Sequence, residues 1–230
     1  MSPFLKTDGR HRTLEGWPLV FTTLTILAVL VGGTVEFLPL GLMETNLPTI
    51  STVTPYTPLE LTGRDLYIRE GCVSCHSQQI RPFRDEIERY GDYSKPGESV
   101  YDRPFLWGSK RTGPDLSRVG GKYPDLWHVR HLEDPRSTSP NSLMPPYKWL
   151  LNQDVKLDDL PAKMNGLRTL GTPYTDSDIE GAVQDAKAQA GNIARTIAAS
   201  GGPQGLESKE IVAVIAYLQR MGTDLAKSQN

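Results

Sequence analysis

The sequence predicts an all-α protein: a single N-terminal transmembrane helix followed by a helical domain in water. Three stretches support this prediction. From residue 17 to residue 35 there is no charge over roughly nineteen positions, which is about one bilayer crossing at 1.5 Å per residue. Residues 208–221 repeat apolar side chains at the spacing of an amphipathic helix. Residues 175–200 form an alanine-rich stretch with an apolar stripe at alternating spacings of three and four.

Composition narrows the class of protein. The chain has 230 residues, which allows one or two domains, and a formal net charge of -2. It therefore lacks the basic surplus of a nucleic-acid-binding protein, and no nucleic-acid partner is expected. Hydrophobic residues make up 38%, which is modest for a membrane protein. Contact with membrane lipid should be limited to the one apolar helix.

The charges around the apolar stretch predict its orientation. Basic residues cluster before the span, and the first base after it is Arg64. The positive-inside rule then predicts a cytoplasmic N-terminus over residues 1–16 and a transmembrane anchor over 17–40. A Pro- and Thr-rich linker (41–58) and an exported domain (59–230) follow. The alternative is a cleaved signal peptide, whose apolar region would be shorter, about 7–15 residues.

The anchor has one polar face. Small and hydroxyl side chains allow close helix packing in lipid, so this face predicts a partner helix, although such residues are also tolerated in any membrane helix. An acid within a membrane is a functional candidate, but Glu36 lies at the outer boundary, where simple hydration is an equal explanation. The face consists of Thr22, Thr25, Val29, Gly32 and Glu36.

The most informative stretch is Cys72-Val73-Ser74-Cys75-His76, which has the C-x-x-C-H spacing of c-type haem attachment. Two thiols on one turn can bond the haem vinyl groups, and the next histidine lies under the iron. A redox dithiol, half of a zinc site or a disulfide are the alternatives. A dithiol does not need His76, and zinc needs a second Cys pair, whereas this chain has 2 cysteines. One covalent haem c is predicted, and its attachment implies export.

An electron-transfer haem also needs a second axial ligand. Met144 lies in a loop stiffened by two prolines over residues 142–147, which can hold a thioether against iron without helix geometry. His128, His131 or an open position are the alternatives. A His/Met pair raises the reduction potential relative to two histidines.

Two predicted helices complete a cytochrome pattern. One covers residues 59–70 and leads into the haem motif, and the other covers 208–221, with Ser208 as its N-cap and Gly222 as its stop. Such a pair is typical of class I cytochromes c. The Gly113-Pro114-Asp115-Leu116 run resembles one in that class, and the resemblance implies that the Pro114 carbonyl accepts a hydrogen bond from the proximal histidine. An ordinary turn is the alternative.

Residues 77–110 form an insertion between the haem motif and the Gly-Pro run. The insertion is rich in Arg and aromatic residues, which are enriched in the buried centres of interfaces. It can therefore serve as a contact for a partner or pack on its own domain. The same question applies to the apolar stripe of residues 175–200, for which packing on its own domain is the favoured interpretation.

Several longer runs carry a specific resemblance. They are R-E-G-C-V-S-C-H-S-Q-Q-I-R-P-F-R, E-R-Y-G-D-Y-S, G-E-S-V-Y-D-R-P-F-L-W-G-S-K-R-T-G-P-D-L, V-G-G-K-Y and S-L-M-P-P-Y-K-W-L. With the anchor, they resemble the membrane-anchored mono-haem subunit (subunit II, FixO/CcoO family) of cbb(3)-type cytochrome c oxidases. The resemblance extends from the anchor to about Tyr174.

The resemblance implies a function for each site residue. Cys72 and Cys75 would hold the haem, with His76 and Met144 as the axial ligands of its iron. A di-haem cytochrome c subunit or a soluble cytochrome c would supply electrons. They would pass to the haem b and copper of the catalytic subunit, which reduces oxygen to water and pumps protons. The chain would sit in the bacterial inner membrane with its haem domain in the periplasm. It would be a non-catalytic subunit of the respiratory oxidase.

Two other functions fit a tethered haem domain. One is a cytochrome serving another enzyme, such as nitric oxide reductase, against which the insertion of residues 77–110 argues. The other is a haem-based gas sensor, which needs an easily opened sixth position. The family's catalytic subunit carries a calcium ion, to which no residue of this chain can be assigned.

Overall fold

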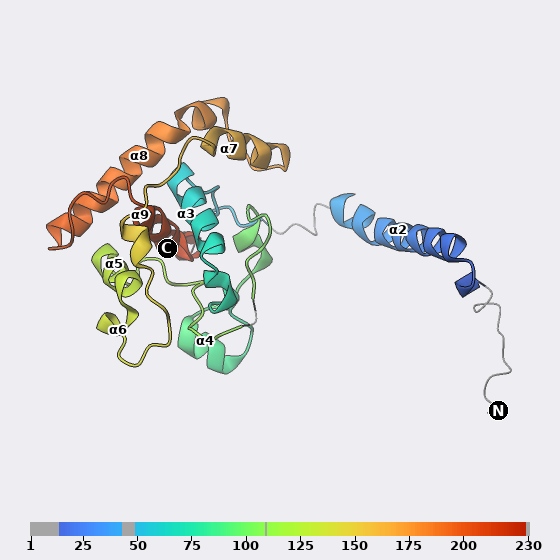
Figure 1. Cartoon of the computed structure of the whole chain (residues 1–230), viewed down its shortest axis with the longest axis horizontal. Coiled ribbons are helices and arrows are strands. Elements are labelled where there is room, and N and C mark those ends of the chain that lie inside the picture. The colour runs from blue at the N-terminus through green and yellow to red at the C-terminus, as the bar shows by residue number, and fades with distance from the viewer. Residues whose placement is uncertain (1–13, 43–48, 109, 229–230) are drawn as a thin grey trace. The chain divides into compact units, whose positions relative to one another are not determined.

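The computed structural model describes residues 14–42, 49–108 and 110–228. The regular elements within these residues are helices, and the one β-type pairing is a single bridge between Asp154 and Lys209. The all-α prediction is confirmed. Contacts divide the chain into two compact units, Met1–Pro48 and Thr49–Asn230, which are coloured from blue to red along the chain in Figure 1.

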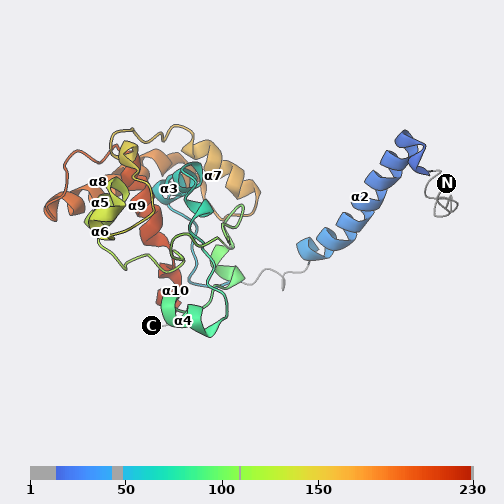
Figure 2. The ribbon, with the colours of Figure 1, turned by 60° about the horizontal axis from the view of Figure 1, so that its bottom comes forward.

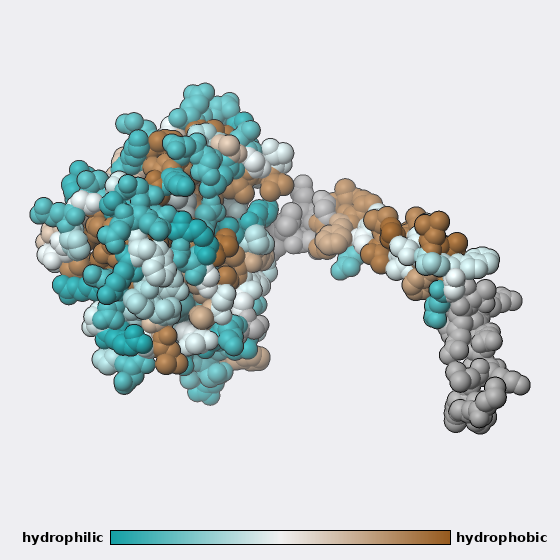
Figure 3. Space-filling model, in the orientation of Figure 1, coloured by the Kyte–Doolittle hydropathy of each residue, from teal (hydrophilic) through white to brown (hydrophobic). Residues whose placement is uncertain are grey.

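The first unit contains the long helix α2 (Pro18–Leu42). Its segment Pro18–Leu40 is long and apolar enough to cross a membrane, and its apolar side chains are exposed, as the brown atoms of Figure 3 show. Two of its hydroxyls, those of Thr25 and Thr34, donate to backbone carbonyls one turn back at 2.9 and 2.8 Å. These hydroxyls are satisfied within the helix, as an apolar environment requires.

The second unit is built on the crossing of α3 (Pro58–Arg69) and α9 (Glu210–Arg220), which lie side by side in Figures 1 and 2. At the crossing, a Cβ added to Gly63 would lie 1.9 Å from the backbone oxygen of Ala213. Glycine therefore lets the two backbones touch. Beside it, the rings of Tyr67 and Tyr217 meet edge to face at 5.4 Å. Every side chain of α9 from residue 210 to residue 218 is buried, so this helix is the centre of the core.

The start of α9 differs from the sequence prediction. Ser208 was expected to cap this helix, but Lys209 holds the cap position and makes no side-chain cap bond. The Ser208 hydroxyl instead donates to Asp154 at 3.1 Å, and the Glu210 amide donates to the Gln153 carbonyl at 3.0 Å. A neighbouring chain segment therefore satisfies the helix start in place of a local cap. The predicted stop is confirmed: the helix ends at Arg220 with Met221 as its C-cap, and Gly222 follows with a φ of 78°.

The alanine-rich stretch forms α8 (Asp176–Ala199), which packs against α3, α9 and α7 (Leu160–Thr169). A capping box between Thr175 and Asp178 starts the helix. The domain itself covers the predicted apolar stripe. Its members Ala186, Ala190 and Ile197 are buried, and Ile179, Val183 and Ile193 are partly buried.

Shorter helices complete the domain around this core. They are η3 (Cys72–Ser74), α4 (Arg84–Tyr90), η4 (Pro96–Ser99), α5 (Asp125–Glu133), α6 (Pro135–Thr138), η5 (Lys148–Leu151) and α10 (Thr223–Ser228).

Candidate haem site

The C-x-x-C-H motif follows directly on the core helix α3. The chain turns at Gly71, whose φ of 73° is left-handed, and Cys72 then opens the short helix η3. The amides of Cys75 and His76 both donate to the Cys72 carbonyl, at 3.1 and 2.9 Å. This compact turn brings both cysteines and the histidine together. Both thiols are free, with Cys72 half-buried and Cys75 exposed.

A zinc site finds no support in the part of the chain that the structure describes. A zinc site needs about four ligands, and these residues contain no group of three or more His, Cys, Asp or Glu side chains arranged to hold a metal ion.

The His76 ring is fixed by the Gly-Pro run. Its Nδ1 lies 2.8 Å from the Pro114 carbonyl oxygen. Because a carbonyl can only accept, Nδ1 carries the proton, and Nε2 is the nitrogen left with a free lone pair. A Cβ on Gly113 would lie 2.2 Å from the His76 Cε1, so the ring packs directly on this glycine. Burial also lowers the pKa of His76, which favours the neutral imidazole that ligates metals.

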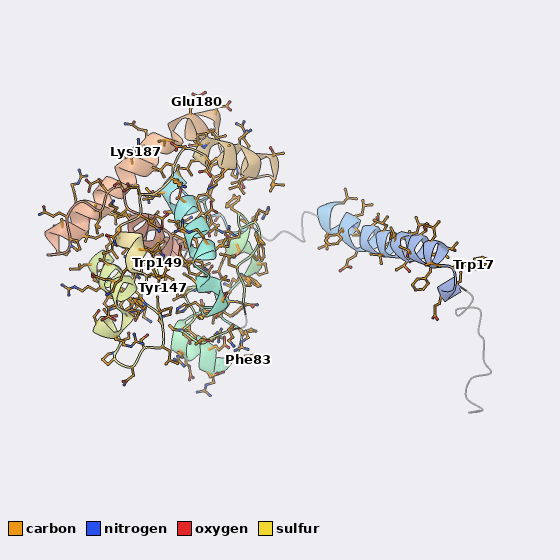
Figure 4. All side chains as sticks on the ribbon, in the orientation of Figure 1. Trp17, Phe83, Tyr147, Trp149, Glu180 and Lys187 are labelled. Atoms are coloured by element: carbon orange, nitrogen blue, oxygen red, sulfur yellow. The ribbon has the colours of Figure 1, made fainter. Side chains whose placement is uncertain are left out.

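Met144 lies in a loop that is tied to the haem motif. The Met144 side chain is half-buried against the hydrophobic core. Directly after the loop, in η5, the Trp149 indole donates to the Glu70 carboxylate at 2.9 Å. Glu70 lies two residues before the first motif cysteine. The rings of Tyr147 and Trp149, which are neighbours in Figure 4, have their centroids 5.2 Å apart. The tie brings the rigid loop to the end of α3, where the motif begins.

The two histidines of α5 have structural partners. His128 is 2% exposed, and its ring meets Trp127 edge to face at 5.4 Å. Burial lowers its pKa to about 4, so it packs as a neutral ring, and its Nε2 has no hydrogen-bond partner among the described residues. His131 stacks on Trp127 at 4.6 Å, and its Nδ1 lies 2.6 Å from the Thr138 hydroxyl. Burial lowers the pKa of His131.

The segment 77–110 packs on its own domain. Ile80 and Leu106 enter the interior, and the buried Asp102 pairs with the buried Arg64 of α3 at 2.8 Å. Some of its aromatic residues remain outside, among them Phe83, which projects from the start of α4 in Figure 4. The segment is therefore a packed part of its own domain, and its solvent-facing side also carries apolar side chains.

A network of charged groups links the residues that follow His76 to the residues on either side of Pro114. Asp115 accepts hydrogen bonds from the Ser77 hydroxyl and the Gln79 amide, at 2.5 and 2.9 Å. Arg111 donates to Ser77 at 2.8 Å and to Glu86 of α4 at 2.7 Å. Neither carboxylate was among the predicted site residues. An acid directly after the Gly-Pro pair was a visible signal for Asp115, whereas nothing in the sequence marks Glu86.

Acid should weaken the domain through Glu86. Hydrogen bonding from Arg111 lowers the pKa of Glu86 to about 2, below its ordinary value of about 4.3. The ionised carboxylate therefore stabilises the folded state fully above about pH 5, and this contribution is lost as the pH falls toward 2. We expect the gap in melting temperature between the detergent-solubilised wild type and Glu86→Gln to narrow from pH 6 to pH 3. A gap that does not change with pH would contradict the ion pair. Glu88→Gln, in an exposed pair with Arg84, should melt like the wild type throughout.

These residues fit a covalently attached haem. The compact turn presents two thiols and a neutral histidine whose outer nitrogen is free, and a half-buried thioether lies in the loop tied to that turn. Apolar side chains next to these residues in the chain, including Val73, Leu116 and Tyr147, are partly buried against the hydrophobic core. Such a site can hold a flat apolar ring and two axial ligands.

Comparison with known families agrees with this geometry. Residues 11–225 match the family described as cytochrome C oxidase, mono-heme subunit/FixO. The chain belongs to this family. A search of curated proteins found no match. Family membership means that the chain is a mono-haem subunit of a cytochrome c oxidase with a role in electron transfer.

Proposed function

We propose that the chain is the electron-relay subunit of a cbb(3)-type haem–copper oxidase, with one haem c bound covalently to Cys72 and Cys75. His76 and Met144 would ligate its iron. A haem supplies a one-electron couple that needs no atom transfer. The contact of 2.8 Å between the His76 Nδ1 and the Pro114 carbonyl carries the proposal, because it leaves Nε2 as the ligating nitrogen.

The chain contributes position and protection to this relay. The Pro114 carbonyl fixes the rotation of the His76 ring, and Gly113 gives the ring a flat surface. The bond between Trp149 and Glu70 holds the Met144 loop to the motif. With both His76 and Met144 ligating the iron, oxygen would have no open position on it, so oxygen chemistry would belong to another subunit and this chain would not be catalytic by itself.

The partners follow from this role. The recipient of electrons is the catalytic subunit with haem b and copper, and the donor is a di-haem cytochrome c subunit or a soluble cytochrome c. The exposed apolar surface of α2 supports a single crossing of the bacterial inner membrane. Residues 1–16 then lie in the cytoplasm and the haem domain in the periplasm.

Purification of the full-length chain in mild detergent tests this function. We expect a complex that contains covalent haem together with non-covalent haem b and copper, and that consumes oxygen when given a reduced electron donor. Purification with a nitric oxide reductase, or of the chain alone with haem c, would contradict the proposal. Rapid CO binding to the reduced chain would instead support a gas sensor.

A further inference from the structure

We propose that Glu86 is a positioning residue for the proximal histidine: acting through Arg111, it holds the Pro114 carbonyl against His76 and so helps to set the reduction potential of the haem. This inference rests on the proposed function of Cys72–His76 as the haem site. It gives the segment 77–110 a role at the haem, in addition to any role as a contact for partners.

Glu86 is a buried carboxylate on a short surface helix. Its side chain is 4% exposed, although most of its neighbours on α4 are exposed or half-exposed. It accepts hydrogen bonds from the Arg81 amide and from the Arg111 guanidinium, both at 2.7 Å. A second Arg111 nitrogen lies 2.6 Å from its other oxygen. This is a two-pronged contact of fixed geometry, which is stronger and more directional than a single ion pair.

Arg111 connects the two chain segments that must meet at the histidine. It lies three residues before Pro114, and it donates to the Ser77 hydroxyl at 2.8 Å and to the Gln79 carbonyl at 2.7 Å. The guanidinium therefore joins the chain directly after His76 to the chain directly before Pro114. A Tyr90 ring on α4, 5.3 Å from the guanidinium carbon, covers its face.

Asp115 fixes the other side of Pro114. It accepts from Ser77 and Gln79, and its second oxygen accepts from the Ser117 amide at 2.8 Å. Pro114 is thus flanked by two charged residues that both bond to the residues following His76. The Pro114 carbonyl therefore has little freedom to move away from the His76 ring. The ring itself is held in place by its close packing on Gly113. Of these charged residues, Glu86 alone comes from α4.

The position of this carbonyl matters because it controls how strongly the histidine donates electrons. A shorter Nδ1–H···O bond makes the imidazole more basic and favours oxidised iron. Loss of Glu86 removes a negative charge and loosens the carbonyl, and both changes favour reduced iron. We therefore expect Glu86→Gln to raise the midpoint potential. Arg111→Lys keeps every charge but loses the planar fork, so a change in this variant reports positioning and not charge.

The experiment is a redox titration of the full-length, haem-loaded chain in detergent, together with proton NMR of the shifted His76 ring signals. We expect both Glu86→Gln and Arg111→Lys to raise the potential and to move the ring signals. Glu88→Gln, on the same helix with a side chain that is 63% exposed, should leave both unchanged.

A midpoint potential that shifts in Glu86→Gln but not in Arg111→Lys would show that Glu86 acts only through its charge. That result would overturn the positioning role. An unchanged potential in both variants would overturn it as well. If Glu86→Gln fails to fold, Arg111→Lys alone decides between these outcomes. Failure of Cys72–His76 as the haem site gives a different result, because the wild-type chain would then contain no covalent haem.

Discussion

Replacing Met144 with alanine is expected to abolish the near-infrared band that a methionine–iron bond gives in the oxidised protein. The reduction potential should fall, because axial ligands set it over a range of about 0.8 V and the thioether favours reduced iron. The reduced variant should also bind CO quickly, since one axial position is open. Absorption spectra, a redox titration and CO mixing on the purified full-length chain measure all three effects.

Met164→Ala is the matched control. This methionine is buried at 1% exposure on α7, in the core and not in the proline-stiffened loop. Truncating the Met164 side chain should lower the free energy of unfolding by about 2–5 kcal/mol and leave the near-infrared band unchanged. A band that persists in Met144→Ala would show that another residue ligates the iron, and His131→Ala would then be the variant to examine.

Replacing Gly63 with alanine is expected to destabilise the haem domain strongly. In an ordinary helix this change stabilises by about 1 kcal/mol. Here the new Cβ would lie 1.9 Å from the Ala213 carbonyl oxygen and 2.9 Å from the Tyr217 Cβ, so α3 and α9 would have to separate. We expect a loss of about 3 kcal/mol or more, which is a large part of the 5–15 kcal/mol that holds a typical domain. Thermal unfolding followed by circular dichroism measures the loss.

Two other helical glycines provide controls for that variant. Alanine at Gly166 of α7 or Gly191 of α8 would meet no atom within 4 Å. Both variants should melt at or slightly above the temperature of the wild type, as helix propensity predicts. If Gly63→Ala melts with them, the close crossing of α3 and α9 is wrong.

The sequence predicted those parts of the protein that are encoded locally. The charge-free stretch of α2 and the apolar spacing of α9 each determine a helix over a few turns. The haem motif is equally local, because its chemistry depends on three residues within five positions. The Gly113-Pro114 run was recognisable because its resemblance to class I cytochromes c included both its residues and its order.

Features that depend on distant residues were not predictable. Gly63 looks like a weak point in a helix, and only the path of α9 shows that no other residue fits there. In the sequence, Glu86 resembles an ordinary solvent-exposed charge. Only its tertiary contact with Arg111 shows that it is a buried, paired carboxylate. Ser208 was wrongly assigned as a cap because the segment around Asp154 takes its hydroxyl. In each case, a tertiary contact overrides or creates the local preference.

The pairing of α3 with α9 also dictates the order in which the domain can be completed during its synthesis. Arg69 and Glu210 bond across 141 residues of chain, and α3 alone, with 12 residues, is too short to be stable in water. The core cannot close until the ribosome has made almost the whole domain. Cys72 and Cys75 therefore lie in an unfolded segment while the remaining residues are synthesised. Any enzyme that attaches a group to these thiols has that interval in which to act.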